Sequence, residues 1–86
     1  MKVEDVFCSK TRLRTVKVLL QLGQLNVSEV ARRLGVNYCT ARKHLQILEQ
    51  EGVVRHMVYG RINLYRFNHA STKAKAMQNL LETWEH

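Results

Sequence analysis

A run of polar side chains between positions 37 and 51 has the residue types and the spacing to bind a polyanion. At about 100° per residue, one face of a helix over this run gathers two cations, two amides and a thiol: Cys39, Arg42, Lys43, Gln46 and Gln50. Guanidinium, ammonium and amide groups donate hydrogen bonds to phosphates and to the edges of nucleobases. The two acids of the run, Glu49 and Glu51, lie toward its flank and its C-terminal end. The pattern therefore favours nucleic-acid binding.

The charge balance of the whole chain points the same way. Fourteen Lys and Arg residues stand against seven Asp and Glu, which gives a formal net charge of +7 and a pI near 9.9. Such an excess favours a polyanionic partner, because each neutralised phosphate releases condensed counterions. Charge alone leaves two alternatives open, a membrane surface and a basic protein that has no anionic partner.

The polar face requires a helix whose opposite face is buried. Asn37 is a suitable N-cap for a helix from about 37 to 51, and Gly52 is a suitable stop. Three apolar residues gather on the inner side of this helix: Ala41, Leu45 and Leu48. We expect this helix, the third of the four helices predicted below, to be the element that enters a groove of the nucleic acid.

A shorter helix, Asn26–Leu34, is predicted just before it. Asn26 can cap this helix in a capping-box-like exchange with Glu29, and Gly35 supplies the left-handed residue that ends it. Its apolar stripe consists of Val27, Val30, Ala31 and Leu34. Two helices joined by the tight turn 35–37 make a helix-turn-helix.

A β-hairpin is predicted next, between about 53 and 67. Two segments rich in β-branched and aromatic residues, Val53–Val58 and Ile62–Phe67, flank the turn Tyr59-Gly60-Arg61. Tyr65 and Phe67 are expected to point inward. Such a hairpin is a wing that can follow the neighbouring backbone or minor groove.

The remaining elements are a helix at each end of the chain. The first is predicted over Ser9–Leu22 with Ser9 as N-cap, and a short helical turn over Val3–Phe7 precedes it. The last is predicted over Asn68–Trp84 with Asn68 as N-cap. Its apolar stripe is Ala70, Ala74, Met77, Leu81 and Trp84. The order predicts one α+β domain over residues 1–86, a winged helix-turn-helix.

The segment from Val27 to Phe67 resembles the ArsR/MarR-type winged-helix regulators. The matching pieces are ARRLGV in the second helix, TARKHLQIL in the third, EGVV at its exit and GRINLYRF in the second strand. The resemblance implies a transcription regulator that binds double-stranded DNA with its third helix and wing. Carried over by position, the implied DNA contacts are Asn37, Tyr38, Cys39, Thr40, Arg42, Lys43, Gln46 and, at the wing tip, Arg61. Tyr38 and Cys39 depart from the small or amide residues common in the family, so an unusual base-reading pattern is expected.

Several residues have an alternative reading without contact to DNA. Arg32 and Arg33 are candidate phosphate contacts, or they solvate their helix. Thr40 either contacts DNA or supports the turn. His44 is expected to be a packed structural histidine. His56 and Tyr59 either touch DNA from the wing or are half-exposed hairpin side chains.

Other kinds of site find little support in the sequence. Cys8 and Cys39 lie far apart, so neither a disulfide scaffold nor a zinc pattern is expected. His69 and Glu82 fall at opposite ends of the last helix, too far apart for one ion, although a site between subunits stays open. No nucleophile, base and oxyanion set appears, so neither an enzyme nor a cofactor is expected.

The sequence thus predicts a cytoplasmic regulator that binds double-stranded DNA as a homodimer. The first and last helices would form the dimer interface, because each has apolar residues beyond those that one core needs. The competing interpretation is a winged-helix module that binds a partner protein within a larger assembly, and an RNA-binding winged helix is a further one. The acid-free face of the third helix favours DNA.

Overall fold

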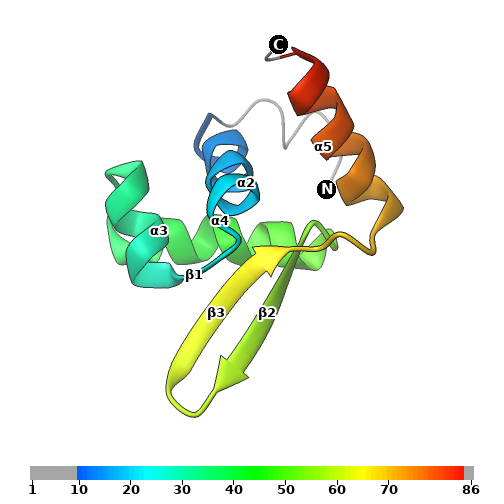
Figure 1. Cartoon of the computed structure of the whole chain (residues 1–86). Helices are drawn as coiled ribbons and strands as arrows, with labels where there is room; N and C mark the ends of the chain where they lie inside the picture. Colours follow the sequence, from blue (N-terminus) through cyan, green and yellow to red (C-terminus); the bar gives the residue numbers. More distant parts are fainter. Residues whose placement is uncertain (1–9, 85–86) are drawn as a thin grey trace.

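The computed structural model describes residues 10–84 and contains four helices and three strands (Figure 1). In chain order these are α2 (Lys10–Leu22), β1 (Gln24–Asn26), α3 (Val27–Leu34), α4 (Tyr38–Gln50), β2 (Val54–Tyr59), β3 (Ile62–Phe67) and α5 (Thr72–Trp84). The predicted Ser9 cap, the turn over Val3–Phe7 and Cys8 lie outside the described residues. The order of elements confirms the predicted winged helix-turn-helix.

The helix-turn-helix forms through the predicted caps. The Asn26 Oδ1 atom accepts a hydrogen bond from the backbone N–H of Glu29 at 2.8 Å, and the Asn37 Oδ1 atom accepts one from Thr40 N–H at 2.8 Å. Between the helices, Gly35 has a φ of 70°, in the left-handed region that a side chain disfavours. The reciprocal half of the expected capping box is absent, because the Glu29 carboxylate bonds Arg32 instead.

The wing is an antiparallel hairpin with a two-residue turn at Gly60 and Arg61. Its register pairs Val54 with Phe67 and Tyr59 with Ile62. A third strand, β1, was not predicted from the sequence; it pairs with β3, so the strand order is β1-β3-β2. Because β1 runs directly into α3, the sheet attaches the wing to the start of the helix-turn-helix.

The core lies where α2, α3 and α4 meet the inner face of the sheet. Tyr65 and Phe67 are buried, as expected, at 3% and 2% exposure. The other buried apolar side chains are Val16, Leu19, Val27, Val30, Ala31, Leu34, Ala41, Leu45, Leu48, Val53, Val54, Ala74 and Met77. The predicted inner face of α4 and the stripe of α3 are thereby confirmed.

The last helix begins later than predicted. The Asn68 side chain donates to the carbonyl of Gly52 at 3.0 Å and does not cap α5. Ser71 takes the capping role, since its Oγ atom accepts from Ala74 N–H at 3.2 Å. Ala70 therefore precedes the helix and is exposed, whereas Ala74 and Met77 are buried.

Truncating Leu45 should destabilise the domain strongly. Its side chain is 0% exposed, so Leu45→Ala removes buried methyl groups and leaves a cavity. We expect the free energy of unfolding, measured by urea denaturation, to fall by about 2–5 kcal/mol. The near-isosteric Leu45→Met is the matched control and should cost less than about 1.5 kcal/mol. Equal, small losses for both variants would contradict this account of the core.

Candidate nucleic-acid interface

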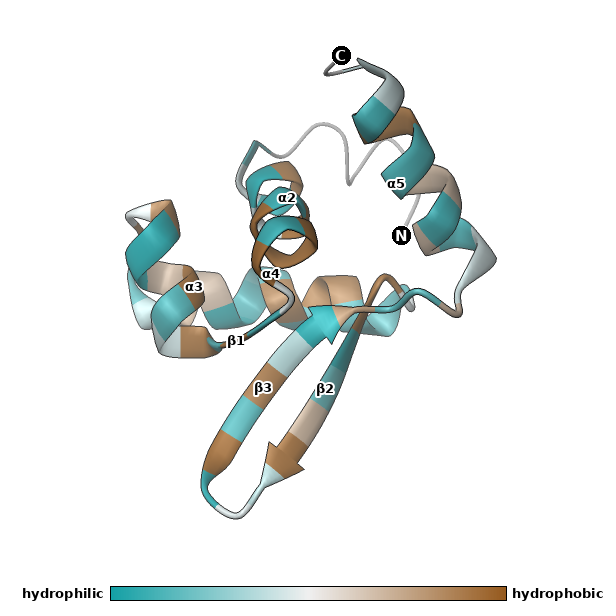
Figure 2. Ribbon diagram, in the orientation of Figure 1, coloured by the Kyte–Doolittle hydropathy of each residue, from teal (hydrophilic) through white to brown (hydrophobic). Residues whose placement is uncertain are grey.

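The outer face of α4 carries exposed polar side chains above a fully buried inner face. Arg42, Lys43 and Gln46 are exposed, while the inner residues Ala41, Leu45 and Leu48 are each 0% exposed. Figure 2 shows polar and apolar residues interleaved along α4, as this division requires. Neither cation has an acidic partner within residues 10–84. The face therefore presents hydrogen-bond donors to solvent with no carboxylate to neutralise them.

The first turn of α4 combines capping with exposed groups. The amide oxygen of Asn37 is engaged by the N–H of Thr40, and Thr40 is half-buried. This hydrogen bond caps the start of the helix through the Thr40 backbone, and the Thr40 hydroxyl takes no part in it. Tyr38 is 48% exposed, and Cys39 is an exposed free thiol. Tyr38 and Cys39 are thus the accessible side chains of this turn.

Arg32 and Arg33 differ from the cations of α4 because each has an acidic partner in its own helix. The Arg32 guanidinium donates to the Glu29 carboxylate, and Arg33 Nε lies 3.8 Å from the same carboxylate. The hydrogen bond from Arg32 is the main cause that holds the pKa of Glu29 below its ordinary value. This pairing fits the alternative in which the two arginines solvate α3.

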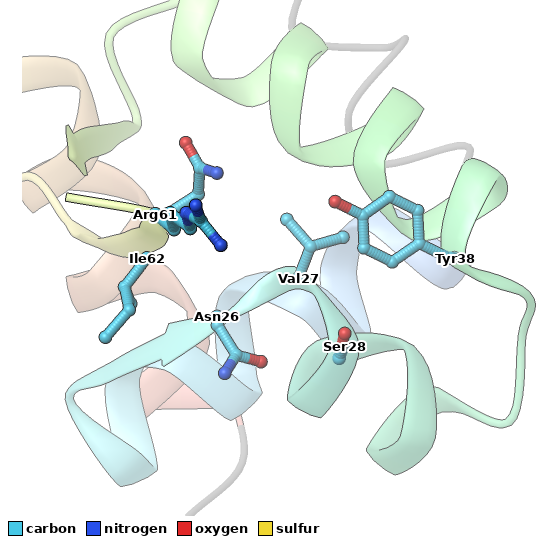
Figure 3. Close-up of a pocket in the computed structure, with 7 residues that line it drawn as sticks. Asn26, Val27, Ser28, Tyr38, Arg61 and Ile62 are labelled. Atoms are coloured by element: carbon cyan, nitrogen blue, oxygen red, sulfur yellow. The ribbon is translucent and has the colours of Figure 1, made fainter. Parts of the chain in front are cut away.

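The turn of the wing places Arg61 beside the start of both helices of the helix-turn-helix. A polar hollow of about 190 Å³ lies between them, and Figure 3 shows its lining side chains. Its lining residues are Asn26, Val27, Ser28, Tyr38, Arg61, Ile62 and Asn63. Of this set, only Tyr38 and Arg61 were predicted from the sequence to contact DNA. The others come close through the β1–β3 pairing, for which the sequence held no local signal.

The remaining wing residues divide by their contacts. The His56 ring stacks on Tyr65 with ring centroids 4.5 Å apart, and its Nε2 atom lies 2.9 Å from Asn63 Oδ1. The His56 side chain therefore packs against β3, the partner strand of its own hairpin. Val58, Tyr59 and Ile62 are more than half exposed, and Figure 2 shows hydrophobic residues reaching the tip of the wing.

His44 is half-buried on α4, as expected for a packed histidine, and its Nδ1 atom is buried without a hydrogen-bond partner. Burial, followed by the positive charges of Arg12 and Lys43, lowers the pKa of His44 below the ordinary 6.5. The neutral imidazole is therefore the form that the folded protein favours.

Residues 10–84 hold neither a cluster of metal-ligating side chains nor a membrane-spanning helix. No three His, Cys, Asp or Glu side chains in that range gather closely enough to hold a metal ion. None of the helices there is long and apolar enough to cross a membrane.

Comparison with known proteins gives a family match and close structural neighbours. The model of the bacterial regulatory protein family ArsR matches residues 9–56, more than half of the chain. HlyU from Vibrio cholerae superposes with a TM-score of 0.78 and 28% identity, covering 93% of this chain and 84% of HlyU. No curated protein sequence matches significantly.

Two further solved structures are similar. One is the homodimeric winged helix-turn-helix DNA-binding domain of a possible ArsR-family regulator from Mycobacterium bovis, with a TM-score of 0.78 and 26% identity over 96% of this chain and 74% of that one. The other is the transcriptional repressor BigR from Xylella fastidiosa, with a TM-score of 0.75 and 26% identity over 92% of this chain and 78% of that one. These neighbours are regulators rather than enzymes.

The lowered pKa of His44 predicts a pH dependence of stability. Because the unfolded chain binds this proton more tightly, the contribution is fully present above about pH 6.5 and is lost as the pH falls through the folded pKa. The free energy of unfolding should decline as the pH falls below about 6.5, and His44→Gln should flatten the decline. His69→Gln, at an exposed position, is the matched control and should keep it. A slope unchanged by His44→Gln would disprove the assignment.

Proposed function

The chain belongs to the bacterial ArsR family of regulatory proteins, and from this premise we propose that it binds double-stranded DNA sequence-specifically as a homodimer. The family and the structural neighbours support regulation of transcription through DNA binding. The observation that carries the finer proposal is the outer face of α4, whose cations have no acidic partner within residues 10–84.

In this proposal α4 is the recognition helix. The major groove of DNA is about 12 Å wide and admits one α-helix. Arg42, Lys43 and Gln46 project from the exposed face of α4 and have the donors, and in Gln46 also the acceptor, that base edges require. Cys39 borders the same face. Arg32 and Arg33 lie on α3 and pair with Glu29, so they would contact phosphate at the edge of the interface only by leaving that carboxylate.

The wing adds a second, less selective contact. Arg61 occupies the turn of a hairpin that extends away from the core (Figure 1). A cation at such a tip meets phosphate oxygens or the minor groove, where the hydrogen-bond pattern distinguishes little beyond A·T from G·C. We therefore assign sequence selection mainly to α4 and a sequence-independent share of the affinity to the wing.

A dimer is proposed because the terminal helices carry exposed apolar side chains. Leu22 of α2 is 46% exposed, and in α5 Leu80 is 47% and Trp84 is 84% exposed. The structurally similar DNA-binding domain from Mycobacterium bovis is a homodimer. We propose that residues 1–86 act as one domain in which α2 and α5 pair with a second copy. Two recognition helices would then enter major grooves roughly 34 Å apart.

Variants of the recognition helix and of the wing should fail in different ways. Lys43→Ala or Gln46→Ala should cost about 1–3 kcal/mol on the preferred site, selected from random duplexes, and much less on random DNA. Arg61→Ala should weaken binding to the preferred site and binding to random DNA nearly equally. The log–log salt slope of the dimer should be roughly −5 to −9, and Arg61→Ala should reduce it by about one unit per subunit.

The control for these measurements is Lys75→Ala, which removes an exposed cation from α5. It should leave the specific affinity nearly unchanged. If no duplex binds even at low salt, DNA binding is wrong. The competing interpretations replace the proposal if the α4 variants bind DNA as tightly as the unaltered protein does, and if binding of RNA or of a partner protein is lost in Lys43→Ala.

The dimer interface can be tested with one added charge. Trp84→Glu should dissociate the dimer in sedimentation equilibrium, because a buried carboxylate without a partner is costly. Thr83→Glu is the matched control, an exposed neighbour on the same helix. Equal association of the two variants, or a monomeric unaltered protein at high micromolar concentration, would rule out α5 as the interface.

A further inference from the structure

The hollow between the wing and the helix-turn-helix, which we call the wing pocket, is lined by the seven residues named above. It receives side chains from α3, α4 and the hairpin, and it is open to solvent (Figure 3). Its lining includes one cation, Arg61, and no acid. A polar pocket of this charge is suited to an anion.

Three lining side chains bring hydrogen-bond donors that are not otherwise used. The Arg61 guanidinium, the Tyr38 hydroxyl and the Ser28 hydroxyl have no hydrogen-bond or ion-pair partner in the described part of the chain. In Figure 3 the two hydroxyls are directed toward the space beside Val27, and the Arg61 guanidinium reaches toward it from the wing. The donors thus come to one pocket from three separate elements: α3, α4 and the turn of the hairpin.

The acceptors of the pocket are already engaged. The Asn26 amide oxygen accepts from Glu29 N–H, and the Asn63 amide oxygen lies 2.9 Å from His56 Nε2. A ligand here would meet the Arg61 cation and the two hydroxyls, which can all donate hydrogen bonds. A phosphate offers only acceptor oxygens, and arginine binds it with two parallel hydrogen bonds.

We propose that the wing pocket holds one phosphate of the DNA backbone in each half-site, bound by Arg61, Tyr38 and Ser28. The proposal rests on the proposed function and deepens it. Tyr38 then contacts the backbone instead of a base. A phosphate shared by the wing and the helix-turn-helix fixes the register of α4 in its groove.

Methylphosphonate mapping tests the proposal directly. One phosphate at a time in the preferred duplex is replaced by its uncharged methyl analogue, and the affinity of each duplex is measured. We expect one position per half-site that weakens the unaltered protein about tenfold, as the loss of charge-assisted hydrogen bonds requires. Tyr38→Phe and Arg61→Ala should bind the all-phosphate duplex more weakly and should be nearly insensitive to that substitution. Ser28→Ala should show the same effect to a smaller degree.

The matched control is Tyr59→Phe, which removes the hydroxyl of an exposed wing tyrosine outside the pocket. It should keep the full penalty at the mapped position. If every variant keeps that penalty, the phosphate is bound elsewhere and the proposal is wrong, while loss of specific binding in Gln46→Ala would leave the proposed function standing. If inorganic phosphate binds the protein through Arg61 and Tyr38, but no methylphosphonate position weakens DNA binding, the pocket binds a free anion. That result would overturn the proposal. Failure to bind any duplex would refute both.

Discussion

The burial of one side of α4 is the constraint on which the interface depends. Ala41, Leu45 and Leu48 are completely buried against α2, α3 and the inner face of the sheet. Since helical residues three and four apart share a face, this contact fixes the rotation of α4 about its axis. Arg42, Lys43 and Gln46 then have no freedom to turn inward. Hydrophobic packing therefore decides which side chains α4 presents to solvent, and in the proposed complex these are the side chains that would read DNA.

The placement of the acids completes this arrangement. Glu29 pairs with Arg32 and Arg33, Glu51 pairs with Lys73, and the Glu49 carboxylate lies 3.9 Å from His56. Glu29 and Glu51 are thus each held beside a cation that does not belong to α4. The two cations on the outer face of α4, Arg42 and Lys43, keep no such partner within residues 10–84.

The sequence predicted the features that local chemistry determines. Asn26, Asn37 and Gly35 act through neighbours a few residues away, and the structure places them as expected. The strand β1 was missed because Gln24–Asn26 is too short to show alternation and exists only through pairing with β3. Asn68 was assigned to the wrong role because its partner, the carbonyl of Gly52, lies 16 residues away. The same reasoning applies to the wing pocket, whose lining residues are brought together by long-range pairing.

The short strand β1 has a mechanical consequence. It connects α2 to α3 while it pairs with β3, so the wing and the helix-turn-helix are joined by backbone hydrogen bonds as well as by packing. The base of the wing, at Leu64–Arg66, therefore cannot move away from the start of α3 without breaking that ladder. In the proposed dimer, adjustment to different operators would then fall to the joint between the two subunits, where a small rotation would change the span between half-sites without altering the arrangement of α3 and α4 within a subunit.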